Sequence, residues 1–388
     1  MLSTLAQRAL DRAGLGGIRD KVLARQRLTE EDALRVLEAR DLAAVGALAN
    51  HVREERHGDL AFYNRNVHLN FTNVCVASCK FCSFARPDDK AASEGYTMTV
   101  DEAVGHVLSK RELGITEVHI VNGLHPDLGW DFYLEVPRRL RAAWPELKIK
   151  GYTAVEIHFF AEKFGKSYEQ VLRELQAAGV DTLPGGGAEI FASRVRRKIC
   201  DDKATAEQWL EVHRVAHRLG MKTNATMLYG TIETLAERVD HMARLRTLQD
   251  ETGGFQVFIP LAFHPEHNMI GKAFPKPTGH DGLRTYAAAR LFLDNFDHLK
   301  AYWVMLGERL AQVALSFGVD DLDGTVLEER IYHMAGAKTP QALSESQLHR
   351  LIRAAGRVPA ERDSLYHVLR VHAAAAPPAT SSALRITA

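Results

Sequence analysis

Short apolar segments alternate with amphipathic segments along the middle of the chain. The amphipathic segments repeat hydrophobic residues at helical spacing, whereas the apolar ones are short enough to be buried strands. Such an alternation predicts parallel strands with helices packed outside them. We expect eight strands, at residues 67–71, 117–121, 148–154, 182–183, 223–228, 256–261, 301–305 and 319–322.

The boundaries of the helices are marked by capping residues. A Ser or Thr followed three positions later by Glu or Gln forms a capping box that starts a helix, and a glycine after the last turn ends one. Eight strand–helix units favour a (β/α)₈ barrel of the TIM type, an α/β fold, over an open sheet, and they place the chemistry at the carboxyl ends of the strands. The starts are Thr99 with Glu102, Ser167 with Gln170 and Thr205 with Gln208, and the stops are Gly114, Gly179, Gly220 and Gly318.

The two ends of the chain do not continue this alternation. We assign residues 66–326 to the barrel and residues 1–65 to an N-terminal helical extension, with helices expected from residue 30 and over 41–55. Residues 327–372 are expected to form C-terminal helices, and neither flanking segment shows chemistry of its own. The Ala-, Pro- and Ser-rich segment 373–388 has the composition of a disordered tail.

Composition and charge exclude several classes of protein. The chain has 388 residues, 49 Lys+Arg against 49 Asp+Glu, and 46% hydrophobic residues. A net charge of zero gives no support for a nucleic-acid partner, and no apolar run approaches the ~18–20 residues of a membrane span. Four cysteines and no secretory leader indicate a reduced, cytoplasmic protein.

Three of the four cysteines lie within eight residues. Cys75, Cys79 and Cys82 have the spacing C-x₃-C-x₂-C, and Cys200 is far downstream. Iron–sulfur clusters and structural zinc sites normally take four ligands, so three thiolates imply a missing ligand or an iron left open for a small molecule. A zinc knuckle completed by His68 or by a distant histidine is the alternative. We do not count Cys200 as a ligand, because a lone cysteine is more often a packed residue.

Polar residues follow several of the expected strands. Glu156 and His158, two residues apart at the expected end of the third strand, should point the same way. Gly185, Gly186 and Gly187 predict a close approach of the backbone to a ligand. Arg196 and Arg197 are either carboxylate ligands or part of a solvated basic face. The other candidates are Asn122, Gly123, His125, Glu189, Asn224, Tyr229 and His264.

The cysteine loop, with Phe81 just before its last cysteine, resembles the cluster loop of the radical S-adenosylmethionine (SAM) enzymes. The resemblance implies a [4Fe-4S] cluster on Cys75, Cys79 and Cys82, whose fourth iron chelates SAM and whose electron releases a 5′-deoxyadenosyl radical. In such a site the cofactor carries the difficult chemistry and the protein supplies position and dryness. The implied cofactor-binding residues are Phe81, Asn122, Gly123, Glu189, Asn224 and Tyr229.

Segments between residues 66 and 335 narrow the resemblance to the aminodeoxyfutalosine synthase family, which acts in the futalosine route to menaquinone. They begin at Asn70, Gly123, Thr153, Leu183, Asn224 and Gln249, and Asn122 stands where that family more often has glycine. The resemblance implies addition of the radical to 3-[(1-carboxyvinyl)oxy]benzoate, giving 6-amino-6-deoxyfutalosine, with flavodoxin or ferredoxin as electron donor. The implied catalytic candidates are His125, Glu156, His158 and His264.

Other functions remain open at this point. The dehypoxanthine futalosine cyclase and the deazaflavin-precursor synthase share the cluster loop and the barrel with that family but use other substrates. The runs Thr153–Glu156 and Leu183–Glu189 favour the synthase. A non-catalytic zinc-binding scaffold is the alternative from a different class.

Overall fold

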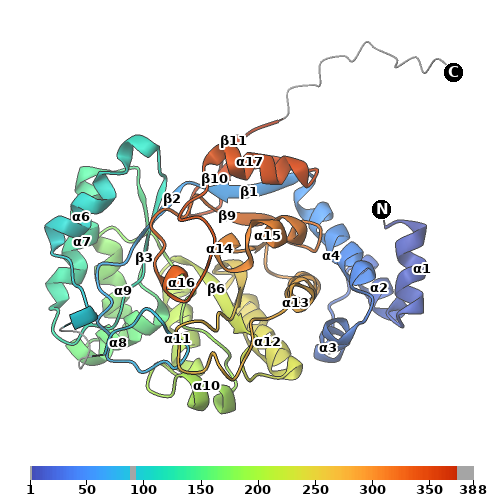
Figure 1. Ribbon diagram of the computed structural model, residues 1–388, viewed down its shortest axis with the longest axis horizontal. Helices are drawn as coiled ribbons and strands as arrows, with labels where there is room; N and C mark the ends of the chain where they lie inside the picture. The colour runs from blue at the N-terminus through green and yellow to red at the C-terminus, as the bar shows by residue number, and fades with distance from the viewer. Residues whose placement is uncertain (1, 88–92, 374–388) are drawn as a thin grey trace, which may run out of the picture.

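The computed structural model describes residues 2–87 and 93–373, and a curled sheet of parallel strands lies at its centre (Figure 1). Seven strands pair in chain order from β2 to β8, each parallel to the next. They are β2 (Asn66–Leu69), β3 (Glu117–Ile120), β4 (Lys148–Gly151), β5 (Thr182–Leu183), β6 (Lys222–Tyr229), β7 (Phe255–Ala262) and β8 (His298–Leu299).

Helices follow the strands and cover the outside of the sheet. Capping boxes start most of them, including the three expected from the sequence and a fourth at Thr153–Glu156. The helices are α6 (Val100–Leu108), η1 (Arg111–Leu113), α7 (Trp130–Ala143), α8 (Ala154–Phe164), α9 (Tyr168–Ala177), α10 (Ser193–Ile199), α11 (Ala206–Arg218), α12 (Leu235–Thr252), α13 (Gly279–Phe292), α14 (Trp303–Leu306) and α15 (Glu308–Ala314).

The barrel closes through single bridges rather than through an eighth full strand. Lys300, just after β8, bridges Asp321 in β9 (Asp321–Gly324), and Val67 in β2 bridges Leu327. The backbone amide of His68 donates to the carbonyl of Leu327 at 2.8 Å. Residues 321–327 therefore fill the gap between β8 and β2, and the expected barrel architecture is confirmed.

A second sheet covers one end of the barrel and combines the two ends of the chain. Its order is β11-β10-β1-β9, with β1 parallel to both neighbours and β11 antiparallel to β10. Figure 1 shows this sheet beside α17, with the N-terminal helices along one flank, where α3 and α4 pack on α13. The elements are α1 (Thr4–Arg12), α2 (Gly16–Leu23), α3 (Glu30–Glu38), α4 (Leu42–His57), β1 (Leu60–Asn64), α16 (Ile331–Met334), α17 (Glu345–Ala354), β10 (Val358–Arg362) and β11 (Val368–Val371).

Several expectations from the sequence need correction. Residues 303–306 form a helix, and the seventh strand lies earlier, at β8. The side chains of Trp303, Val304 and Met305 are all buried, so the apolar run could not distinguish a strand from a buried helix. The third strand ends at Gly151 rather than at residue 154, because Thr153 caps α8. Strands β1, β10 and β11 were not expected in the flanking segments, and most of the predicted tail lies outside the described residues.

No helix within residues 2–87 or 93–373 is long and apolar enough to cross a membrane.

The end of the barrel beneath the second sheet is filled by buried charges. Glu117 of β3 and Lys150 of β4 form an ion pair at 2.7 Å, and each side chain is at most 2% exposed. Ser364, in the turn between β10 and β11, donates a hydrogen bond to Glu117. Burial acts to raise the pKa of Glu117, but the charges of Lys150 and Arg362 outweigh it and hold the pKa well below its usual range.

This ion pair makes a stability prediction. Glu117→Gln should destabilise the protein by about 3–5 kcal/mol, because Lys150 would keep a buried charge without a partner. Glu169→Gln, in the exposed pair between Glu169 and Arg173 on α9, is the control and should cost about 0.5 kcal/mol or less. Denaturant midpoints measure both, and equal effects would show that the buried pair is not needed.

Candidate active site

The cysteine loop follows β2 and is fixed to three other segments by backbone hydrogen bonds. The amide of Cys75 donates to Arg86 at 3.0 Å, that of Val76 to Leu124 at 3.0 Å, and that of Lys80 to Ile199 at 2.9 Å. Cys75, Cys79 and Cys82 are free thiols that line one cavity of about 290 Å³. The loop therefore presents all three sulfurs to the same space at the carboxyl ends of the strands.

The spacing of the thiols fits a cluster better than a zinc ion. A tetrahedral zinc ion with Zn–S bonds of ~2.3 Å brings its sulfurs to within about 3.8 Å of one another. Across the described ranges, two groups of three His, Cys, Asp or Glu side chains have ligand atoms within 4.8 Å of one another, and neither contains a cysteine. The three thiols lie farther apart than zinc requires, even with His68 considered, which suits a larger inorganic unit.

One wall of the cavity is held by the carboxylate of Glu156. Its Oε2 accepts hydrogen bonds from the amide (2.7 Å) and the hydroxyl (2.9 Å) of Thr153. Its Oε1 accepts from the amide of Asn122 at 3.1 Å. The Oδ1 of Asn122 in turn accepts from the amide of Phe71 at 2.8 Å, so the turn after β3 is fastened to the residues that lead into the cysteine loop.

Glycine is required in this turn for steric reasons. A Cβ on Gly123 would lie 2.2 Å from the carbonyl oxygen of Val74, next to Cys75. Gly185 and Gly187 also line the cavity, but their close neighbours belong to the protein: a Cβ would lie 2.6 Å from the carbonyl of Asn224 and 2.3 Å from Val155, respectively. These two glycines pack the wall itself, which the sequence-based interpretation had attributed to approach of a ligand.

Opposite charges face the cavity near the cysteines. Glu189, at a positive φ of 47°, forms a buried ion pair with Lys203, and the ammonium of Lys203 lies 5.3 Å from the centroid of the Phe81 ring. Burial raises the pKa of Cys79, and the charge of Lys203 acts in the opposite direction. Lys203 was missed in the sequence, because it lies in a loop with no motif that marks it.

The far half of the cavity is built from histidines, tyrosines and carboxylates. The rings of His68 and His119 stack at 4.7 Å between centroids, and burial lowers the pKa of both, so they are neutral. The Nε2 of His68 and the Oδ1 of Asn224 are buried without a hydrogen-bond partner in the part of the chain that the structure describes. Such orphaned atoms suit a polar ligand. This half also includes His264, Tyr302, Asp323, Glu329 and Tyr332.

Most of the residues singled out in the sequence meet at this cavity. Those that line it are Cys75, Cys79, Phe81, Cys82, Asn122, Gly123, Glu156, Glu189, Asn224 and His264. Segment 327–335, for which no chemistry was expected, contributes Glu329, Ile331, Tyr332 and Ala335. The sequence carried little signal for them, because the segment is irregular and reaches the site only through the closure of the barrel.

Other predicted site residues lie away from the cavity. His158 is on α8 rather than at a strand end, so it does not share a side with Glu156, and its Nδ1 pairs with the hydroxyl of Tyr168 at 2.8 Å. The Nδ1 of His125 accepts from the amide of Asp127 at 3.0 Å, outside the lining. Tyr229 is buried beside Arg238, also outside the lining.

The two arginines have separate places. Arg196 is buried and donates to the backbone carbonyls of Ala188 and Ala204, whereas Arg197 is exposed. Neither lines the cavity.

A barrel with three thiols at the carboxyl ends of its strands defines a radical SAM enzyme, and comparisons agree. Residues 69–245 match the radical SAM superfamily, and residues 252–375 match the CofH/MqnC C-terminal region. Two solved structures share the fold with a TM-score of 0.70: the FeFe-hydrogenase maturase HydG from Carboxydothermus hydrogenoformans (18% identity, 94% of this chain and 85% of that chain) and methylornithine synthase (17%, 88% and 97%).

Curated relatives narrow the class. The chain is 50% identical to aminodeoxyfutalosine synthase of Thermus thermophilus (91% of this chain, 95% of the relative) and 47% identical to that of Streptomyces coelicolor (91% and 93%). It is 38% identical to cyclic dehypoxanthine futalosine synthase of Streptomyces coelicolor (93% and 90%). The chain belongs to the aminodeoxyfutalosine synthase family.

The placement of the four cysteines makes a prediction about iron. Cys200 is buried but does not line the cavity, so Cys200→Ser should keep the iron content of the wild type after anaerobic reconstitution. Cys79→Ser is the matched control and should lose most of it. Iron and sulfide analysis per chain measures both, and loss of iron in Cys200→Ser would make Cys200 a ligand.

Glu156 makes a prediction about pH. Burial raises its pKa from 4.5 to about 7, although hydrogen bonds from Thr153 and Asn122 act to lower it. The folded state therefore holds this proton more tightly than the unfolded state, and the resulting stability is full below about pH 4.5 and is lost as the pH rises through 7. Glu156→Gln removes this dependence.

The stability of the wild type relative to Glu156→Gln should therefore fall between pH 5 and pH 8, by about 2–3 kcal/mol. Urea midpoints of the cluster-free chains at the two pH values measure the difference without contributions from acid loss of the cluster. A difference that stays constant with pH would show that Glu156 does not titrate in this range.

Proposed function

We propose that this chain is an aminodeoxyfutalosine synthase of menaquinone biosynthesis. It joins the 5′-deoxyadenosyl group of SAM to the vinyl carbon of 3-[(1-carboxyvinyl)oxy]benzoate and yields 6-amino-6-deoxyfutalosine and methionine. The observation that carries the proposal is the identity of 50% and 47% to two synthases over nine-tenths of the chain, against 38% for the cyclic dehypoxanthine futalosine synthase. Transferases that use tyrosine reach at most 40%.

The donor set supports a [4Fe-4S] cluster on Cys75, Cys79 and Cys82. A bound cluster would supply the single electron that cleaves SAM, and a small electron carrier such as flavodoxin or ferredoxin would provide it. The protein's part is to hold the three thiols on a fixed loop and to keep water from the cavity, where electrostatic interactions are strong. Phe81 contributes an apolar face beside Cys82 and Lys203.

We assign SAM to the half of the cavity next to the cysteines. The turn Asn122–Gly123, held by Glu156, offers backbone atoms at the wall, and Asn224 offers an unpaired side-chain oxygen. Glu189 and Lys203 present a carboxylate and an ammonium side by side, which suits the ammonium, carboxylate and ribose groups of SAM. The two charges balance each other until the ligand enters, so neither is left buried alone.

We assign the benzoate substrate to the far half. Its two carboxylates need hydrogen-bond donors, and the neutral rings of His68, His119 and His264 lie there with Tyr302 and Tyr332. His264 uses Nε2 to contact the carbonyl of Met305 at 3.0 Å, and its buried Nδ1 has no partner among residues 2–87 and 93–373. That nitrogen is the best-placed contact for the substrate among the three histidines that the sequence singled out.

The fate of the adenosyl carbon tests the proposal. SAM labelled with ¹³C at the 5′ carbon should deliver its label to aminodeoxyfutalosine, because the radical adds to the double bond instead of abstracting hydrogen. Addition requires the vinyl carbon to lie within about 3–3.5 Å of the 5′ carbon. Mass spectrometry of the products follows the label, and release of labelled 5′-deoxyadenosine in step with product would assign the chain to a hydrogen-abstracting sister enzyme.

His264→Ala separates positioning from cleavage in the same assay. It should lower coupled product by about tenfold or more, while uncoupled cleavage of SAM continues, if one hydrogen bond to a charged group is lost. His158→Ala is the control and should leave both unchanged, because His158 lies outside the cavity.

A further inference from the structure

Two histidines and a glutamate converge at the edge of the second sheet, far from the cysteine loop. Glu345 and His349 are one turn apart on α17, and His372 follows β11. The Nε2 atoms of His349 and His372 lie 3.6 Å and 3.5 Å from the Oε1 of Glu345. All three atoms surround the hydroxyl of Tyr63 on β1, at 2.8, 3.0 and 2.6 Å respectively.

These separations are those of ligands around one small cation. Ligand atoms 2.0–2.2 Å from a zinc ion lie about 3.3–3.8 Å from one another in tetrahedral or trigonal geometry. Both printed edges to Glu345 fall in this range, and the three ligand atoms all lie within 4.8 Å of one another. The hydroxyl of Tyr63, close to all three, provides a fourth oxygen.

The ligand atoms are also available to an ion. The side chains of Glu345, His349 and His372 are 37%, 12% and 14% exposed, so an ion can enter from solvent. Without an ion, the hydroxyl of Tyr63 donates to Glu345 and accepts from the two Nε2–H groups, which satisfies the cluster. An ion has only to displace the protons of two imidazoles whose Nε2 atoms already point to one place.

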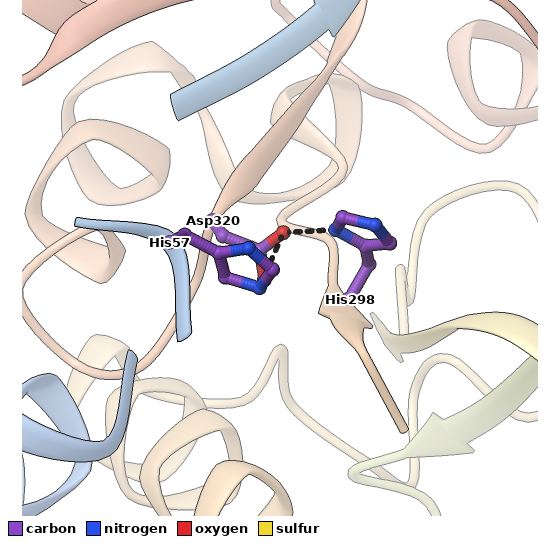
Figure 2. Close-up of side chains that lie close together, drawn as sticks. All are labelled: His57, His298 and Asp320. Carbon is purple, nitrogen blue, oxygen red and sulfur yellow. Dashed lines mark hydrogen bonds and ion pairs between the residues drawn. The ribbon is translucent and has the colours of Figure 1, made fainter. Parts of the chain in front are cut away.

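A second cluster of the same composition shows what a committed set looks like. Figure 2 shows His57, His298 and Asp320, whose carboxylate accepts from the Nδ1 of His298 at 2.6 Å. The other oxygen of Asp320 is taken by the buried guanidinium of Arg290 and by the amide of Leu299. The Nε2 of His57 is bound to the carbonyl of Asp297 at 2.9 Å, so this cluster has a resident cation and no free ligand atoms.

We propose that Glu345, His349 and His372 bind a divalent transition-metal ion, with zinc as the best match. Two imidazoles and a carboxylate suit zinc among the divalent ions, with the hydroxyl of Tyr63 or a water in the fourth position. The ion joins β1, α17 and the end of β11, three segments that are distant in sequence. The site is therefore a structural fastener of the second sheet, separate from the cavity and from the proposed function.

Metal analysis of the cluster-loaded enzyme tests the site. After incubation with zinc chloride and desalting, the wild type should retain one zinc per chain in addition to its iron, and zinc should raise its melting temperature. His372→Ala and His349→Ala should lose that zinc, with at least about tenfold weaker binding, and their melting temperature should no longer respond to zinc. Iron measured on the same samples shows that no zinc has entered empty cysteine sites.

Two control variants make the result specific. His367→Ala removes an exposed histidine that pairs only with Asp363, and His57→Ala removes one member of the committed cluster; both should keep the zinc. Cobalt in place of zinc should give the absorption of a four-coordinate ion in the wild type and none in His372→Gln, a milder change at the end of β11. A wild type without zinc, or equal zinc in wild type and His372→Gln, would overturn the proposal and leave a hydrogen-bonded cluster.

Discussion

The candidate active site depends on the buried carboxylate of Glu156, which joins three segments at one point. It caps α8 through Thr153 and accepts a hydrogen bond from the amide of Asn122. Asn122 binds the amide of Phe71, and Gly123 packs against Val74 immediately before Cys75. A change at the start of α8 would therefore reach the first cysteine through two hydrogen bonds and one steric contact. A cluster site needs this rigidity, because its thiols lie on a loop.

The polarity of the barrel interior has a second consequence. Alternate residues of a strand point to the same side, so Glu117 lies directly beneath His119 on β3. The floor of the cavity is thus an ion-paired layer of Glu117 and Lys150, closed from below by Ser364 in the second sheet. A charged layer without access to water resists repacking, because every change leaves a partner unpaired. The second sheet therefore does more than join the chain ends: it completes the bottom of the active-site cavity.

Sequence patterns predicted the architecture well where local signals and tertiary structure agree. The capping boxes at Thr99, Ser167 and Thr205 start helices as expected, and the long central strands β6 and β7 differ from expectation by one residue at each end. The motif of three cysteines located the site. The prediction was wrong where one pattern has two meanings: residues 301–305 are apolar both as a strand and as a buried helix.

The missed parts of the site depend on contacts that leave no local pattern. Glu156 and His158 seemed equivalent two residues apart, but the capping box at Thr153 turns that segment into a helix and separates them. Lys203 is recognised only through its partner Glu189, fourteen residues earlier in the chain. The hydrogen bond between His68 and Leu327 brings segment 327–335 to the cavity, and no periodicity of that segment could have indicated it.

The two matched regions of the chain divide the cavity along the same line as the proposed chemistry. Residues 69–245, shared with the radical SAM superfamily, contain the cysteines, Asn122, Glu156, Glu189 and Lys203. Residues 252–375 contain His264, Tyr302, Glu329 and Tyr332, which face the far half. Enzymes that share the radical chemistry but differ in substrate need to preserve the first set and vary the second. The sister enzymes, at 37–40% identity, are therefore best compared at the residues of the far half, where a difference of one polar group changes which substrate can be held.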